Sequence, residues 1–179
     1  MGHDLNMAIN LSVDSLTDLD WPEKITAVLA NSGLEASSIF CEITEGRLME
    51  NASVALDILS RLSLKRFHLS VDDSGTGYSS MEQLQRMPFS EFKIDRVFVR
   101  GASRDVSVLA ILEASVSLAR KLGMKVVAEG VEDQQDWDLV ASMGCDQLQG
   151  YFVSRPLPFL HLVKWLNDRQ AQKKFVPGA

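Results

Sequence analysis

Short apolar runs alternate with helix-type patterns along the whole chain. The runs predict six strands, and each strand ends at or near a polar residue. The predicted strands are Met7–Leu11, Ile39–Ile43, His68–Asp72, Phe92–Asp95, Lys125–Ala128 and Gln147–Gln149. Strands that alternate with helices in this way are typical of a parallel sheet with helical crossovers.

Residues that favour helix ends mark the segments between the strands. Trp21 and Pro22 open a helix that Gly33 closes, as expected for Pro in a first turn and Gly beyond a last one. The clearest apolar stripe predicts a helix over Val106–Leu122. Further helices are expected from about Asn51, over Met81–Met87, from Asp133 to Gly144, and after Pro158.

Alternation within each strand separates an apolar face from a polar one. The apolar face is expected to pack against helices. The other face carries polar or ionisable side chains near the carboxyl ends: Asn10, Glu42, Asp72, Lys93, Asp95, Glu129 and Gln149. Because the carboxyl ends of parallel strands meet at one mouth of a barrel, we expect a ring of polar groups there, where barrel enzymes carry their active sites.

The predicted fold class is therefore α/β, a (β/α)₈ TIM-type barrel that is incomplete, with about six β/α units. A full barrel of this type needs about 250 residues, and the chain has 179. We expect the missing part to precede it. Open strand edges invite pairing with another chain, so a homodimer is expected. Residues 1–169 are assigned to the partial domain and residues 170–179 to a polar C-terminal tail.

Composition narrows the class of protein. The chain is 46% hydrophobic and 23% charged, as is ordinary for one globular domain. It shows no apolar run long enough to span a membrane and no secretory leader, and Cys41 and Cys145 lack metal-type spacing. We therefore expect a cytoplasmic location without membrane contact. The net charge of −6 argues against binding DNA or RNA.

Two adjacent carboxylates, Asp72 and Asp73, end the third predicted strand, and a Gly-punctuated loop follows. Such neighbours repel one another and are costly to desolvate, so they favour a divalent cation. The alternative is an ordinary Asp-Gly turn in which Asp73 caps a short helix.

The donor types at the predicted mouth indicate which metal would bind. Carboxylate and amide oxygens without His or Cys select Mg²⁺ or Mn²⁺ over zinc. Several carboxylates with one lysine fit a two-metal phosphodiester hydrolase. The lysine, Lys93, should stay protonated among these acids and orient the attacking water or bind phosphate.

Six motifs in order resemble those of the EAL-domain family. They are NLS at Asn10, EITE at Glu42, DDSGTGYSS at Asp72, KIDRVFV at Lys93, AEGVE at Glu129 and QGYF at Gln149. That family comprises bacterial cyclic-di-GMP phosphodiesterases with a (β/α)₈ barrel. The resemblance implies hydrolysis of cyclic diguanylate to the linear dinucleotide with Mg²⁺ or Mn²⁺, inhibition by Ca²⁺, and a sensory or receiver domain N-terminal to the barrel.

The resemblance also implies roles for individual residues. The family's metal ligands are matched by Asn10, Glu42, Asp72, Asp73 and Glu129, with Asp72 placed to bridge two ions. Alternatives stay open for the amides, because Asn10 could hydrogen-bond a loop and Gln149 could be a packed polar side chain.

Other matched positions concern the water, the loop and the substrate. Lys93 matches the lysine that acts on the catalytic water, Gln149 a residue that helps hold that water, and Glu45 the glutamate that steadies the DDSGTG loop. Asp95 and Glu132 match supporting acids, although Glu132 could only help start the next helix. Arg96 and Arg155 could contact ligand phosphate or guanine, or form surface salt bridges.

Two departures from the family pattern affect the expected activity. The Glu-Ala-Leu signature of the first barrel strand is absent, and its Glu is a metal ligand, so metal binding and turnover should be weakened. Ser74 stands where the family usually has Phe, which removes an apolar anchor from the loop. The alternative to a phosphodiesterase is therefore a non-catalytic cyclic-di-GMP receptor or a protein-interaction module.

Overall fold

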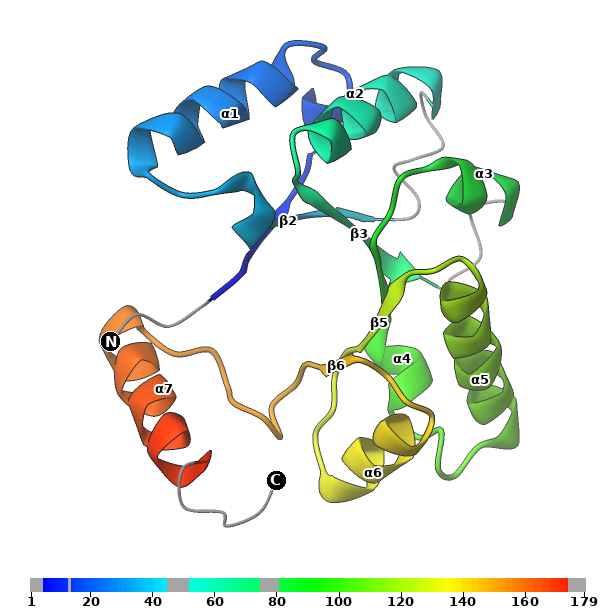
Figure 1. Ribbon diagram of the computed structural model, residues 1–179. Helices are drawn as coiled ribbons and strands as arrows, with labels where there is room; N and C mark the ends of the chain where they lie inside the picture. The colour runs from blue at the N-terminus through cyan, green and yellow to red at the C-terminus, as the bar shows by residue number, and fades with distance from the viewer. Residues whose placement is uncertain (1–4, 13, 45–51, 75–80, 174–179) are drawn as a thin grey trace.

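Six parallel strands form one curved sheet in which sheet order follows chain order (Figure 1). This computed structural model describes residues 5–12, 14–44, 52–74 and 81–173. The strands are β1 (Met7–Asn10), β2 (Ile39–Thr44), β3 (His68–Ser74), β4 (Glu91–Ile94), β5 (Lys125–Ala128) and β6 (Gln147–Leu148). All six predicted strands are confirmed, with ends that differ by no more than two residues.

All helices but the C-terminal one lie along the outer side of the sheet (Figure 1). The helices are α1 (Trp21–Ser32), α2 (Ala52–Leu64), α3 (Met81–Arg86), α4 (Arg96–Val99), α5 (Val106–Lys121), α6 (Gln134–Ser142) and α7 (Phe159–Lys173). Two 3₁₀ turns, η1 (Asp14–Leu16) and η2 (Ala36–Ser38), precede α1 and β2. The sequence pattern did not predict α4 or these turns, because four or fewer residues are too short to display a helical period.

The helix ends follow the predicted signals. Gly33 terminates α1 with a φ of 72°, in the left-handed region that glycine adopts without strain. Asp133 caps α6, since its carboxylate accepts a hydrogen bond of 2.9 Å from the backbone N–H of Asp136. Asp105 caps α5 in the same way through the N–H of Ser107.

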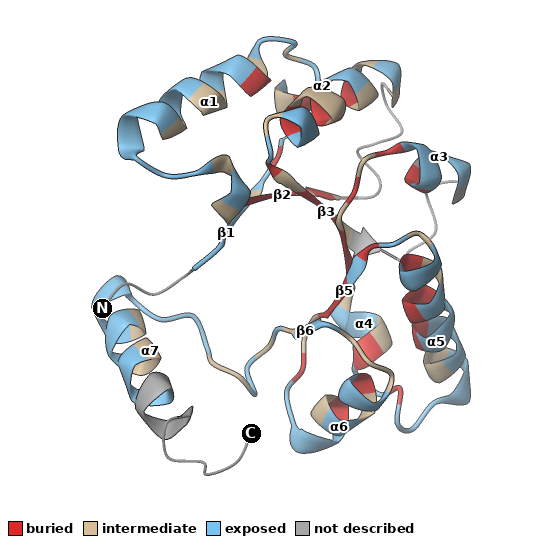
Figure 2. Cartoon of the chain, in the orientation of Figure 1, coloured by how far each residue is buried: buried red, intermediate tan, exposed pale blue. Residues whose placement is uncertain are grey.

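The core lies between the outer face of the sheet and the helices. Buried residues mark the strands and the helix sides that face them (Figure 2). The strands contribute Cys41, Ile43, Leu69, Val71, Phe92, Ile94, Val126 and Ala128, and the helices contribute Ile58, Leu59, Leu62, Leu112, Val116, Ala119 and Val140. The predicted apolar face is therefore confirmed as the face that packs against helices.

The sheet is open at β1 and β6, neither of which has a second partner strand among the described residues. Met7 on β1 is 54% exposed, whereas Cys41 on the neighbouring strand is fully buried. From Phe159 to Arg169, α7 has no buried residue, and it lies apart from the other helices (Figures 1 and 2). The predicted fold, an incomplete α/β barrel with about six β/α units, is confirmed.

The C-terminal helix continues further than its pattern indicated. It runs to Lys173 and so includes the first residues of the segment predicted to be a polar tail. The division at residues 169 and 170 stays a prediction. In the segments that the structure describes, no helix combines the length and apolar character needed to cross a lipid bilayer.

Candidate active site

One lysine gathers three carboxylates from three strands at the carboxyl edge of the sheet. The Nζ atom of Lys93 lies 2.8 Å from Glu42 Oε1 and 2.6 Å from Glu129 Oε1. Asp72 Oδ1 lies 3.1 Å from the same nitrogen. The Lys93 side chain is only 5% exposed, so these contacts lie almost out of water. The predicted meeting of Glu42, Asp72, Lys93 and Glu129 is therefore present.

Stagger between neighbouring strands explains this convergence. Directly paired residues are Glu42 with Ser70, Ser70 with Glu91, and Lys93 with Val127. The four charged residues are thus not partners in the ladder. They meet because the strands of a closing barrel are tilted and displaced along one another, which brings residues from different ladder rows to the same height.

A β-bulge interrupts β3 at the two adjacent aspartates. Val71 pairs with Phe92 and Ser74 pairs with Ile94, so Asp72 and Asp73 together oppose Lys93. Bulges of this kind bend a strand and redirect side chains, and they are frequent next to active sites. Both aspartates belong to β3. The side chain of Asp73 and residues 75–80 lie outside the described structure, so the alternative of a turn with Asp73 capping a helix stays untested.

Burial and charge act in opposite directions on the lysine. Burial lowers the pKa of Lys93, but its hydrogen bonds to Glu129 and Glu42 outweigh burial and hold the pKa above its usual value. Burial also raises the pKa of Glu129, and the contact with Lys93 only partly offsets it. Lys93 is therefore a charged donor at neutral pH and a poor general base.

One carboxylate oxygen in this cluster lacks a hydrogen bond. Asp72 Oδ1 is buried and accepts none from the described residues, although Lys93 Nζ is close by. Within those segments, no three Asp, Glu, His or Cys side chains are grouped closely enough to hold a metal ion as they stand. The carboxylates are arranged around the ammonium group instead.

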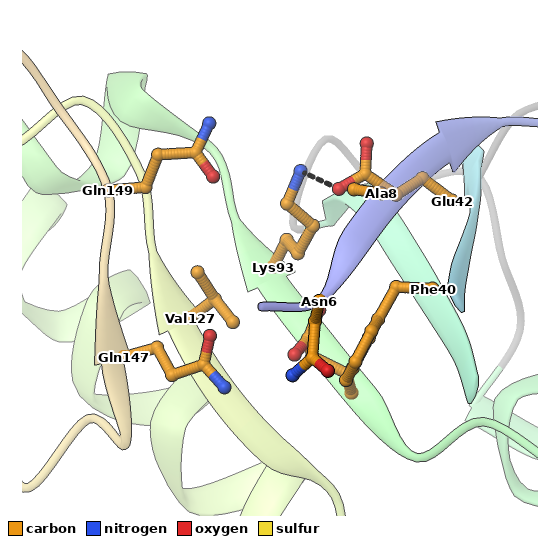
Figure 3. Close-up of a pocket in the computed structure, with 9 residues that line it drawn as sticks. Asn6, Ala8, Phe40, Glu42, Lys93, Val127, Gln147 and Gln149 are labelled. Atoms are coloured by element: carbon orange, nitrogen blue, oxygen red, sulfur yellow. Dashed lines mark ion pairs between the residues drawn. The ribbon is translucent and has the colours of Figure 1, made fainter. Parts of the chain in front are cut away.

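The inner face of the sheet lines a cavity of about 140 Å³ beside this cluster. Figure 3 shows the side chains of Lys93 and Glu42 pointing toward one another, with Gln149 on the other side of the cavity. The lining residues are Asn6, Ala8, Phe40, Glu42, Glu91, Lys93, Val127, Gln147 and Gln149. Gln149 thus shares a cavity with Lys93, as the strand alternation predicted.

Glu91 is a site residue that the sequence analysis did not identify. It is 5% exposed and accepts a hydrogen bond of 2.9 Å from the hydroxyl of Ser70. Burial raises the pKa of Glu91, against the hydrogen bond from Ser70 and the charge of Lys93. Its position two residues before Lys93 was the available signal, because residues two apart in a strand share a face.

Two glycines hold the loops that follow β5 and β6. Gly130 has a φ of 69° and lies so close to Arg96 that a Cβ atom would overlap that side chain. Gly150 lies against the backbone of Val131, where a Cβ would overlap the carbonyl oxygen. The N–H of Val131 donates to the carbonyl of Gln149 at 3.1 Å. Each glycine directly follows a predicted site residue, so close packing fixes the ends of both strands.

Other predicted residues are engaged elsewhere. Asp95 caps α4 by accepting a hydrogen bond of 2.7 Å from the N–H of Val97. Glu132 forms an ion pair with Arg100, and the start of α6 is capped by Asp133. The structure does not bring Asp95 or Glu132 to Lys93.

The two predicted substrate-binding arginines lie near the mouth. Arg96 lines a cavity of about 250 Å³ together with Glu129. The guanidinium of Arg155 lies 4.7 Å from the ring centre of Tyr151, a cation–π contact. In the described part of the chain, neither arginine has an acidic ion-pair partner, so the salt-bridge alternative has no support there.

The remaining predicted site residues lie on the edge strand β1 or outside the described part of the structure. Asn10 is exposed and pairs with Glu42 through the backbone of the sheet. Glu45 lies outside the described residues, as do the side chains of Asp73 and Ser74.

Comparison with known proteins shows the family to which the chain belongs. The sequence model of the EAL domain matches residues 1–156. The chain belongs to the EAL domain family. It is 40% identical over 158 residues to the bifunctional diguanylate cyclase/cyclic di-GMP phosphodiesterase MucR of Pseudomonas aeruginosa. The matched region covers 88% of this chain and 23% of MucR. It is 35% identical to the cyclic di-GMP phosphodiesterase RocR of the same organism, over 93% of this chain and 43% of RocR.

Solved EAL structures share the fold. The MucR phosphodiesterase in complex with cyclic di-GMP matches with a TM-score of 0.83 and 39% identity, over 88% of this chain and 64% of that one. Klebsiella pneumoniae BlrP1, in a manganese and cyclic di-GMP complex, matches with a TM-score of 0.75 and 31% identity, over 82% of this chain and 38% of the BlrP1 chain. This EAL chain thus spans less than half the length of the curated relatives described above.

Removing the ammonium group should destabilise the EAL chain strongly. Lys93→Met would leave three carboxylates facing one another without a counter-ion, at an expected cost of about 3–5 kcal/mol in the free energy of urea unfolding at pH 7. Burial already raises the pKa of Glu129, so protonation of this carboxylate should relieve part of the repulsion, and the deficit should shrink as the pH is lowered. Lys24→Met, which removes an exposed lysine paired with Asp18, is the control and should leave stability nearly unchanged. Equal losses in the two variants would contradict this account.

Gly130 should tolerate substitution less well than a glycine of similar backbone angle. Gly33→Ala introduces only the strain of a positive φ, about 1–2 kcal/mol, because no atom lies within 4 Å of the added Cβ. Gly130→Ala adds overlap with Arg96, so its unfolding free energy should fall by about 1–3 kcal/mol more. Thermal and urea unfolding of both variants measure the difference. Indistinguishable losses would mean that packing at Gly130 contributes nothing.

Proposed function

We propose that this EAL chain is a metal-dependent phosphodiesterase that hydrolyses cyclic di-GMP to the linear dinucleotide. The observation that carries the proposal is the convergence of Glu42, Asp72 and Glu129 on Lys93. Three carboxylates against one ammonium leave a double negative charge in a nearly water-free site. An anionic substrate cannot bind there unless further positive charge is supplied.

The donor types fit Mg²⁺ or Mn²⁺, although the described carboxylates stand around the Lys93 ammonium and would have to turn toward an ion to bind it. All candidate donors are oxygens, which these ions prefer, and the charge excess matches a divalent cation. The buried Oδ1 of Asp72, which accepts no hydrogen bond from the described residues, is the kind of atom that such an ion would satisfy. Glu42, Asp72 and Glu129 would hold the metal, with Asn10 and Asp73 as further ligands. When bound, the metal would polarise a phosphoryl oxygen and lower the pKa of water.

The chain's own polar groups would position substrate and water. Lys93 stays protonated and can donate hydrogen bonds to a phosphate oxygen or to the attacking water, without taking a proton from it. Gln149, directly after β6, opens onto the same cavity and can hold that water through its amide. Arg96 and Arg155 remain candidates for contacts with phosphate or guanine at the rim.

The comparisons support the substrate. MucR and RocR are named cyclic di-GMP phosphodiesterases, and the BlrP1 complex contains both manganese and cyclic di-GMP. We extend the proposal to a cytoplasmic location and to pairing of two chains through the open sheet edges at β1 and β6. The relatives MucR and RocR are longer than this chain, and an N-terminal sensory or receiver domain stays a prediction from the family resemblance.

Calorimetric titration with cyclic di-GMP separates binding from turnover. In Ca²⁺ the chain should bind the dinucleotide without cleaving it, and in Mg²⁺ or Mn²⁺ it should release the linear product, followed by chromatography. Binding in all three ions without product would favour the alternative, a non-catalytic receptor. Failure to bind in any of them would reject both functions and leave an interaction module.

Asp72 should be needed for turnover but not for the fold. Asp72→Asn removes one negative charge from the proposed metal site, and we expect hydrolysis in Mn²⁺ to fall by about 100-fold or more. Asp138→Asn is the matched control, since Asp138 is an exposed helix residue whose carboxylate only accepts a hydrogen bond from Gln134. Retained activity in Asp72→Asn, with an unchanged circular dichroism spectrum, would remove Asp72 from the mechanism.

A further inference from the structure

Ser70 and Glu91 form a buried polar pair below the carboxylate cluster. They are direct partners across β3 and β4, and both are nearly inaccessible, at 0% and 5% exposure. The Ser70 hydroxyl donates to Glu91 Oε1 at 2.9 Å. Glu91 faces the cavity that Lys93 and Glu42 also line.

Stability alone does not account for this pair. Burial of a carboxylate is costly, and two apolar side chains would pack the same space without that cost. Glu91 is not an ion-pair partner of Lys93, whose nitrogen contacts Glu42, Asp72 and Glu129 in the described structure. A buried polar pair of this kind can instead specify one arrangement of the chain among several.

The arrangement that such a pair would specify is the position of the bulge in β3, which follows Ser70 by two residues. Ser70 and Glu91 are the last inward-facing partners before the bulge, where Asp72 and Asp73 together oppose Lys93. A shift of the extra residue by one position would exchange the faces of the residues that follow it. Asp72 would then no longer face the ammonium.

We propose that Ser70 and Glu91 are positioning residues for the active site. Their hydrogen bond fixes the register of β3 on β4 up to Val71, so that the bulge begins at Asp72 and this carboxylate meets Lys93. The consequence for metal binding rests on the proposed function, whereas the positioning itself does not.

Mn²⁺ affinity, measured by electron paramagnetic resonance titration of the free ion, tests the proposal. Ser70→Ala removes the donor and should weaken Mn²⁺ binding about tenfold. Glu91→Gln keeps an oxygen that accepts from Ser70 and should stay within about twofold of the unsubstituted chain. Ser142→Ala is the control and should bind Mn²⁺ as the unsubstituted chain does, because the Ser142 hydroxyl donates to the carbonyl of Leu139 within α6 and does not join β3 to β4.

Unchanged affinity in Ser70→Ala would overturn the proposal, as would a loss in Glu91→Gln equal to that in Ser70→Ala, because charge would then matter in place of the hydrogen bond. If the unsubstituted chain binds no Mn²⁺, the proposed function fails, and a metal-free measurement decides the positioning. Urea unfolding of Ser70→Ala, Asp72→Asn and the double variant should then be non-additive. Additive losses would overturn the proposal.

Discussion

The buried ammonium of Lys93 is the interaction on which the arrangement of the strand ends depends. Glu42, Asp72 and Glu129 come from three strands, and each would be expensive to bury without a nearby cation. The ion contacts therefore require that β2, β3 and β5 stand at a fixed height relative to β4. The stagger between strands, the bulge in β3 and the close contacts of Gly130 and Gly150 are the backbone features that set these relative positions.

Side-chain periodicity was sufficient to predict most of the fold and the residues at the centre of the site. Alternation in strands such as Glu91–Ile94 was sufficient to assign the faces, because one face of the sheet packs against helices and the other meets at the mouth. It also placed Glu42, Asp72, Lys93 and Glu129 together without knowledge of strand pairing. The six motifs then pointed to the EAL family, which the comparisons confirm.

Periodicity could not predict three features, because they depend on backbone geometry, on burial or on local competition for hydrogen bonds. Asp95 has the same alternation as Lys93, yet the start of α4 takes its carboxylate as a cap. The bulge in β3 arises from the register of two strands, which a single strand does not display. Glu91 was overlooked because a charged residue at the start of an apolar run ordinarily indicates a solvent-exposed strand end.

Sheet order that follows chain order has a consequence for how the molecule assembles. Each strand pairs with its successor in sequence, so every pairing closes a short loop and none within the described sheet waits for a distant segment. β2 to β5 can dock one after another as the polypeptide emerges during synthesis. The charges of the site come from four successive units, and Glu42 and Asp72 can meet Lys93 once β2, β3 and β4 are paired. Glu129 joins them only when β5 is in place, so the complete cluster requires all four units.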